Sequence, residues 1–190
     1  FRTSHTIAFA GALLATTSSA TQAQSAVQLS GIIDAGIAYV NDSGNTHGHQ
    51  SAWQAKSGDI NGSRWILSGR EDLGGDLNAA FMLANGFAPM TGTASQQGRL
   101  FGFQSWVALQ SQQLGSLIAG RQFDEVVQFV EPFSLGGTRY GGPAFAHVFD
   151  NDNLDNWTRI NNSVKYVSPL LGGLKLGMLY GFSNQAGGFD

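Results

Sequence analysis

Charged side chains in this chain are sorted by segment. About half of the acids lie between residues 123 and 158, where Arg139 is the only arginine or lysine. These acids are Asp124, Glu125, Glu131, Asp150, Asp152 and Asp155. Most bases lie in or beside segments of alternating polarity, and they are Arg64, Arg70, Arg99, Arg121, Arg159, Lys165 and Lys175. Opposed fixed charges across a narrow watery opening focus a field that sorts solutes by charge. The pattern favours electrostatic selection.

Bond-making chemistry has little support in the sequence. There is no Gly-x-Ser-x-Gly elbow, phosphate-binding glycine loop or histidine-bearing zinc motif. His47 and His49 could touch a metal, but without a third ligand they favour a solvated loop. The absence of cysteine excludes a thiolate metal site and a disulfide framework. We therefore predict no enzyme activity, no metal and no cofactor, and the net charge of −3 argues against a nucleic-acid partner.

The alternating segments predict an all-β antiparallel chain of about seven strands. Their approximate ranges are 27–39, 63–71, 77–84, 99–109, 116–122, 159–166 and 174–182. In the second, Trp65 and Leu67 fall opposite Arg64 and Arg70, so one face is apolar and the other polar. The fourth mixes its faces, since Phe103 and Trp106 differ in parity, and its orientation stays open.

Leu-Gly turns indicate how the strands are joined. They stand at residues 73–77, 114–117 and 171–174, and a longer polar segment follows each. Glycine supplies the positive φ that a tight hairpin needs. Short turns at one end and long loops at the other are typical of an outer-membrane barrel with aromatic girdles. A secreted soluble β-sandwich that binds carbohydrate through Trp53, Trp65 and Trp106 is the alternative, because it has the same alternation. A non-conducting structural barrel is a third reading.

The segment 123–158 is too long for a structureless loop in a compact domain and indicates a functional insertion. Asp124 favours the start of a short helix over 124–130, which Pro132 would close. If the segment folds into the barrel, its acids face basic side chains on the wall. We expect the arginines and Lys165 to line that opening, although exposed charges often only solvate a surface.

The start of the chain predicts export. An apolar run at residues 7–15 precedes a small, polar stretch that ends at Ala23. This pattern is typical of a secretory signal peptide over residues 1–23, with its beginning missing. The fold is then expected to occupy residues 24–190.

Five motifs together resemble the amino-terminal half of the Gram-negative general porins, in the branch typical of β-proteobacteria. They are Gly31–Gly36, Ser63–Trp65 with Gly69–Gly75, Asn85–Phe87, Gly120–Asp124 and Asn161–Tyr166. The resemblance implies a homotrimer of sixteen-stranded transmembrane barrels in the outer membrane, in contact with lipid and lipopolysaccharide. It also implies passive diffusion of small hydrophilic solutes, often anions, past a third loop folded inward as a constriction. By resemblance, Arg64, Arg70, Arg121 and Arg159 belong to the basic wall, and the acids of 123–158 belong to the constriction.

The chain departs from that pattern at two positions. Ala84 stands where the resemblance predicts glutamate, and Phe103 stands where it predicts arginine. Losing one charge of each sign makes the opening more apolar. About seven strands cannot close a barrel of even strand number, so we expect the chain to be part of a product about twice as long.

Overall fold

The computed structural model describes residues 26–45, 48–58, 61–133, 158–186 and 188. The predicted signal peptide and residues 134–157 lie outside the described residues. The strands are β1 (Ala26–Ile32), β2 (Ala35–Asn45), β3 (Gly48–Ser57), β4 (Arg64–Gly74), β5 (Leu77–Gly86), β6 (Gln104–Ser111), β7 (Gly115–Gln122), β8 (Ile160–Val167) and β9 (Gly177–Gly181). The helical pieces are α1 (Ser95–Gly98), α2 (Glu125–Phe129) and the 3₁₀ turn η1 (Glu131–Phe133).

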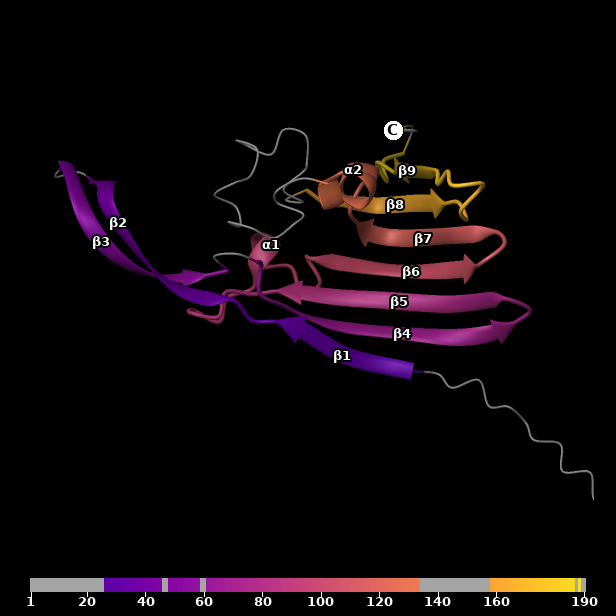
Figure 1. The fold of residues 1–190 in the computed structure, drawn as a ribbon, viewed down its shortest axis with the longest axis horizontal. Coiled ribbons are helices and arrows are strands. Elements are labelled where there is room, and N and C mark those ends of the chain that lie inside the picture. The colour runs from indigo at the N-terminus through magenta and orange to yellow at the C-terminus, as the bar shows by residue number, and fades with distance from the viewer. Residues whose placement is uncertain (1–25, 46–47, 59–60, 134–157, 187, 189–190) are drawn as a thin grey trace, which may run out of the picture.

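The strands form a meander. Seven of the described strands make one sheet in the order β1-β4-β5-β6-β7-β8-β9, and each pair is antiparallel. Figure 1 shows them stacked side by side, with α2 lying over β8 and β9. The predicted antiparallel all-β class is confirmed. No helix among the described residues is long and apolar enough to cross a membrane.

The prediction of one strand over 27–39 was wrong, because the chain bends at Asp34. The Asp34 backbone N–H donates to Ser63 Oγ at 2.8 Å, and Ser63 Oγ donates to the Asp34 carbonyl at 3.0 Å. The Asp34 N–H thus bonds a side chain where β1 stops pairing with β4, while the Asp34 carbonyl also accepts from the Gly58 N–H at 2.9 Å, next to the β2–β3 pair. After the bend, β2 pairs with β3 in a separate sheet that extends beyond the main one (Figure 1). The polar segment of β3 was not predicted as a strand.

Two other boundaries differ from the predictions. The fourth strand begins at Gln104 and not at Arg99, because Gly102 N–H donates to the Arg99 carbonyl in a turn at 3.3 Å. The register also settles the orientation of this strand. Trp106 pairs with Met82 of β5, and Met82 pairs with Ser68 of β4. Because paired residues lie on the same face, Trp106 shares the polar face with Ser68. The last strand is shorter than predicted, since Leu174 pairs with Leu171 in the preceding turn.

Short turns gather at one end of the sheet, as predicted. The turn between β4 and β5 places Gly75 at φ 60° and Asp76 at φ 72°, which aspartate tolerates better than most residues. Asp76 Oδ2 accepts a bond from Ser111 Oγ at 2.8 Å and one from the Gln113 N–H at 3.2 Å. The first two short turns are therefore tied to each other.

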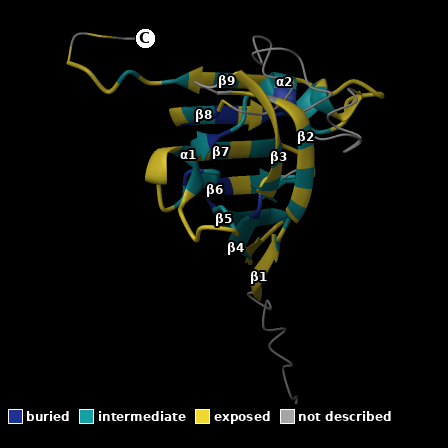
Figure 2. Ribbon diagram, turned by 90° about the vertical axis from the view of Figure 1, so that its left-hand side faces the viewer, coloured by how far each residue is buried: buried dark blue, intermediate teal, exposed yellow. Residues whose placement is uncertain are grey.

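The two faces of the sheet are inverted relative to a soluble protein. Apolar side chains of one face are open, with Leu29 71% and Met178 68% exposed. Polar side chains of the other face are covered, since Ser163 is 1% and Lys165 5% exposed. Figure 2 shows exposed and covered residues alternating along strands such as β2. Buried polar groups beside open apolar ones are informative, because water favours the reverse.

Aromatic side chains mark both ends of the open apolar face. Near the short turns, Tyr166 Oη donates to the Leu114 carbonyl at 2.8 Å. Toward the other end of the sheet, the rings of Tyr180 and Phe182 meet edge to face with centres 4.9 Å apart. Rings that combine an apolar body with a polar tip suit a membrane–water boundary.

Candidate functional site

Arginines converge on one aromatic ring at the end of the sheet where the long connections lie. Phe103 directly precedes β6, and the guanidinium carbons of Arg64 and Arg159 lie 4.6 Å and 4.3 Å from its ring centre. Arg159 also lies 4.4 Å from the ring centre of Phe123. The two phenylalanine rings meet edge to face, 5.8 Å apart. We call Arg64, Phe103, Phe123 and Arg159 the arginine–aromatic cluster. Cation–π attraction explains this arrangement.

Backbone carbonyls hold the guanidinium groups from the other side. Arg159 Nε donates to the Phe103 carbonyl at 3.2 Å. Arg64 Nη1 donates to the Gly62 carbonyl at 2.8 Å and to Asn61 Oδ1 at 3.1 Å. A guanidinium has five donors and no acceptor, so it suits a site rich in carbonyl oxygens. Arg159 is only 8% exposed, and its charge is therefore held by the protein as much as by water.

Arg121 joins this region from the opposite face. Residues directly opposite one another on neighbouring strands lie on the same face of the sheet. Arg121 is aligned in this way with Ser105, Leu83, Leu67 and Leu29, which belong to the apolar face. The pairing of β7 with β8 then shifts by one residue between Gly120 and Gln122. Arg121 Nε donates to the Gly102 carbonyl at 2.8 Å, and its Nη1 donates to Asn161 Oδ1 at 2.6 Å. The sequence grouped Arg121 with the polar wall. The register corrects this, because residue number alone does not relate the parities of different strands.

The remaining predicted bases lie apart. Arg70 is at the short-turn end of β4, where Nε donates to Asn78 Oδ1 at 3.0 Å. Arg99 Nη1 donates to Gln97 Oε1 at 2.5 Å, in the α1 region. Lys165 lies on the polar face of β8, where Nζ donates to Gln128 Oε1 of α2 at 3.1 Å. The structure thus joins Arg64 to Arg159 but not to Arg70.

Helix α2 begins as predicted and ends before Pro132. Asp124 caps it, since Oδ1 accepts from the Val127 N–H at 3.1 Å. The Glu125 carboxylate oxygens are buried and have no hydrogen-bond partner among the described residues. Burial raises the pKa of Glu125, an effect that the Lys165 charge partly offsets. Glu131 starts η1. Asp150, Asp152 and Asp155 lie outside the described residues, so their expected place opposite the arginines stays a prediction.

A polar contact that sequence reasoning missed supports the strands beside the cluster. Gln122 is 2% exposed, and its Nε2 donates to Ser163 Oγ at 3.1 Å. Ser163 Oγ in turn donates to the Gly120 carbonyl at 2.8 Å. The inward parity of Ser163 is readable from its strand, whereas the partner becomes visible only when β7 and β8 are paired. Among the described residues, no three histidine, cysteine or acidic side chains gather to hold a metal.

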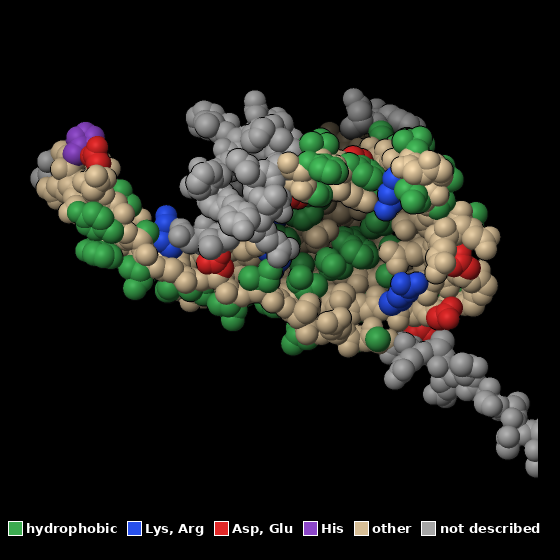
Figure 3. All heavy atoms as spheres, viewed as in Figure 1, with side chains coloured by type: hydrophobic (Ala, Val, Ile, Leu, Met, Phe, Trp, Pro, Cys, Tyr) green, Lys and Arg blue, Asp and Glu red, His purple; other side chains and the backbone are tan. Residues whose placement is uncertain are grey.

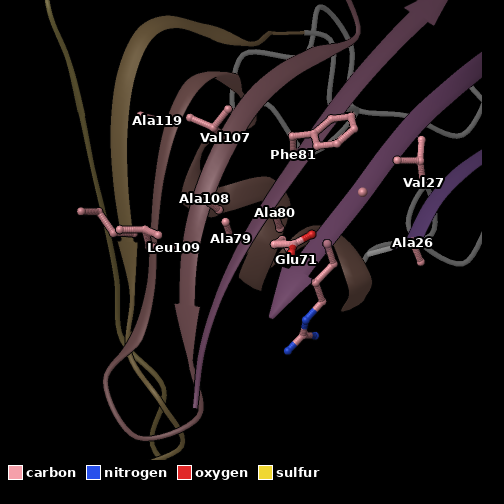
Figure 4. Close-up of a pocket in the computed structure, with 13 residues that line it drawn as sticks. Ala26, Val27, Glu71, Ala79, Ala80, Phe81, Val107, Ala108, Leu109 and Ala119 are labelled. Carbon is pink, nitrogen blue, oxygen red and sulfur yellow. The ribbon is translucent and has the colours of Figure 1, made fainter. Parts of the chain in front are cut away.

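The open face of the sheet is mainly apolar. A groove of about 490 Å³ lies over β1 and β4–β7 with an almost wholly apolar lining (Figure 4). Ala79 and Ala119 leave space beside Phe81 and Val107. Figure 3 looks onto the other face of the sheet, the one in front of which α2 lies in Figure 1, and shows several charged side chains near the short turns. Arg70 and Glu71 are the charged residues among those that line this groove, whereas the arginine–aromatic cluster brings two guanidinium groups to one ring.

These features define a class of protein, namely a membrane β-barrel protein. The open face of its sheet is apolar, and the covered face carries fixed positive charges. Comparison with known proteins specifies the family. The model of the Gram-negative porin family matches residues 10–189, and the chain belongs to this family.

Relatives agree with this assignment. The chain is 38% identical over 188 residues to an outer membrane porin protein of Bordetella pertussis, covering 92% of the chain and 47% of the relative. It is 34% identical over 171 residues to outer membrane porin protein 32 of Delftia acidovorans, covering 88% and 47%. The structure of an anion-selective porin from Comamonas acidovorans superposes with a TM-score of 0.69 at 31% identity, covering 84% of the chain and 47% of that porin. The chain spans about half the length of these relatives.

Proposed function

We propose that the protein forms a water-filled channel in the outer membrane for passive diffusion of small hydrophilic solutes and ions, with a preference for anions. The observation that carries this proposal is the inverted sidedness of the sheet. Open apolar side chains suit lipid, and covered arginine, lysine, serine and glutamine side chains suit an aqueous lumen. A soluble sandwich would bury Leu29 and Met178 in its core, and these are the side chains that stand open.

The arginine–aromatic cluster supplies the charge preference in this proposal. Arg64 and Arg159 place fixed positive charges at the end of the sheet from which the 123–158 segment leaves β7. That segment serves as the inward constriction loop, and its acids face the wall. Low-dielectric walls strengthen the field of such charges inside a narrow opening. The anion selectivity in the name of the Comamonas acidovorans porin supports the sign of the preference.

The proposal extends to the assembly. Three copies form a homotrimer, and lipid and lipopolysaccharide surround its outer surface. The apolar row and the aromatic residues at both ends of it provide the surface for these contacts (Figure 2). No cofactor and no catalytic step are needed, because diffusion down a gradient makes and breaks no bond.

Planar-bilayer recording of the protein expressed from its complete gene tests the channel. We expect stepwise conductance and, under a salt gradient, a reversal potential on the anion-selective side. Replacing Arg64 and Arg159 together by glutamine should move that potential toward cation selectivity. An unchanged potential would remove both arginines from the filter, and a lack of any conductance would favour a purely structural barrel.

A further inference from the structure

One phenylalanine holds two cations that would otherwise repel each other. The guanidinium carbons of Arg64 and Arg159 each lie within 4.6 Å of the Phe103 ring centre. The negative face of an aromatic ring attracts a cation without adding an opposing net charge. A carboxylate in the same place would cancel one of the two positive charges. The ring therefore gathers the arginines and leaves their summed charge intact.

Phe103 is itself fixed by its surroundings. Its N–H donates to the Ala84 carbonyl of β5 at 3.1 Å, which anchors the residue to the sheet. The Phe123 ring meets it edge to face, with the ring centres 5.8 Å apart. Its own carbonyl accepts the bond from Arg159 Nε. The ring is thus a rigid support, and the arginines are the flexible parts that it orders.

The ring's ordering of the two side chains matters because an arginine side chain has many accessible rotamers. A free arginine side chain samples several positions, and two neighbouring ones move apart to reduce repulsion. Stacking on one ring restricts both guanidinium planes and holds their charges at one level of the wall. The sequence departs here from the arginine that the family resemblance predicts. Phe103 positions the charges of Arg64 and Arg159, whereas an arginine in its place would add a charge of its own.

We propose that Phe103 is a positioning residue for ion selectivity, which fixes Arg64 and Arg159 as a two-charge unit at the long-connection end of the sheet. This inference rests on the proposed channel function. It assigns a selectivity role to an uncharged residue that carries no ion itself. The ring's electrons, and not its volume alone, account for the effect.

The test compares three variants of the protein expressed from its complete gene. F103L removes the ring at similar bulk, F103Y keeps the ring, and R159K keeps the charge but loses the planar guanidinium. The readout is the anion-to-cation permeability ratio from the reversal potential in a potassium chloride gradient. Conductance in symmetric salt, recorded on the same channels, reports changes of pore width. Circular dichroism confirms that each variant is folded.

We expect F103L to lower the permeability ratio by about two- to five-fold, the factor that corresponds to the free energy of a single modest cation–π contact. R159K should lower it less, and F103Y should leave it unchanged. An F103L channel with the wild-type ratio would overturn the proposal, as would an F103Y channel that loses selectivity to the same extent. If F103L does not fold, an unchanged ratio in R159K overturns it instead. Wild-type protein without conductance would contradict the channel function and this role of Phe103 together, whereas a conducting F103L channel with the wild-type ratio would contradict this role alone.

Discussion

The two ends of the seven-stranded sheet treat charge differently. At the short-turn end, Arg70 bonds the neighbouring Asn78, and Asp76 accepts bonds from the next turn. At the long-connection end, Arg64 and Arg159 stack on Phe103 and bond backbone carbonyls. At the short-turn end the charged groups form hydrogen bonds with neighbouring residues, whereas at the other end two guanidinium groups are held against one aromatic ring.

Strand β4 shows that this difference does not come from the strand itself. Arg64 and Arg70 lie on the same face of it, near opposite ends. The tight turn beside Arg70 brings Asn78 and Asp76, both in the same hairpin, near enough to interact with it. The connections at the other end bring Phe103 and Phe123 from distant parts of the sequence. Connection length therefore decides which arginine becomes part of a built site.

The largest effect is expected where two strands of the sheet pass close together. Gly120 has φ 141°, and a Cβ there would clash with the Ser105 carbonyl oxygen of β6. Neither the backbone conformation nor the neighbouring strand can accept a methyl group. Backbone strain of this kind usually costs about 1–3 kcal/mol. Because the clash with Ser105 adds to that strain, G120A should lower the free energy of unfolding by at least this amount. Urea unfolding followed by tryptophan fluorescence measures this change.

Gly44 provides the matched control, because a Cβ there would meet no atom within 4 Å. G44A should change the unfolding midpoint by far less than G120A. Equal losses in the two variants would show that glycine content, and not close strand approach, sets the effect.

The second prediction concerns the two arginines of β4. R64Q removes a charge from the arginine–aromatic cluster, whereas R70Q removes a charge at the short-turn end, where Asp76 lies near enough to interact with Arg70. Reversal potentials in a salt gradient should shift toward cations by a larger amount in R64Q. A larger shift in R70Q would place the selective region at the short turns and reverse the comparison.

The smallest effects should be opposite responses to pH at two acids outside the strands. The hydrogen bond from Ser111, with weaker backbone bonds, lowers the pKa of Asp76. The folded state therefore gains stability from the carboxylate above its ordinary pKa, and this gain is lost as pH falls through the lowered value. D76N should be less stable than wild type near neutral pH and equally stable in strong acid.

Glu125 should behave in the reverse way, since burial raises its pKa. Its carboxylate disfavours the folded state above the raised pKa, and this penalty disappears as pH falls toward the ordinary value. E125Q should be more stable than wild type near neutral pH, with the difference vanishing in acid. Unfolding midpoints across a pH series measure both acids, and parallel curves for D76N and E125Q would contradict the contrast.

Alternation was enough to predict most strands of the main sheet. A strand such as β4 puts Leu67 and Ser68 on unlike faces, and that pattern is local in the sequence. The bend at Asp34 was not predictable, because its cause is Ser63, which approaches only after folding. The β2–β3 hairpin was missed for a related reason, since its outer part is polar on both faces.

The site was predictable in its composition but not in its grouping. Bases for the polar wall were predicted from strand parity and from the family resemblance, a role that stays a prediction, and Phe103 was noticed only as a departure. That Arg64 meets Arg159, and that Arg121 approaches from the apolar row, depends on register between strands and on the turn at Gly102. Pairwise register is a tertiary property, so no single strand contains it.

The meander has a consequence for how the wall is assembled. Apart from the β2–β3 hairpin, each strand of the main sheet pairs with its nearest neighbours along the chain. Loop closure is therefore inexpensive in entropy at each short turn, and no segment has to thread past another. The sheet can therefore form by adding one hairpin after the next. Until the sheet is complete, its last strand has an unpaired edge. During that growth the edge is a template for wrong partners, which makes the speed of closure a determinant of yield.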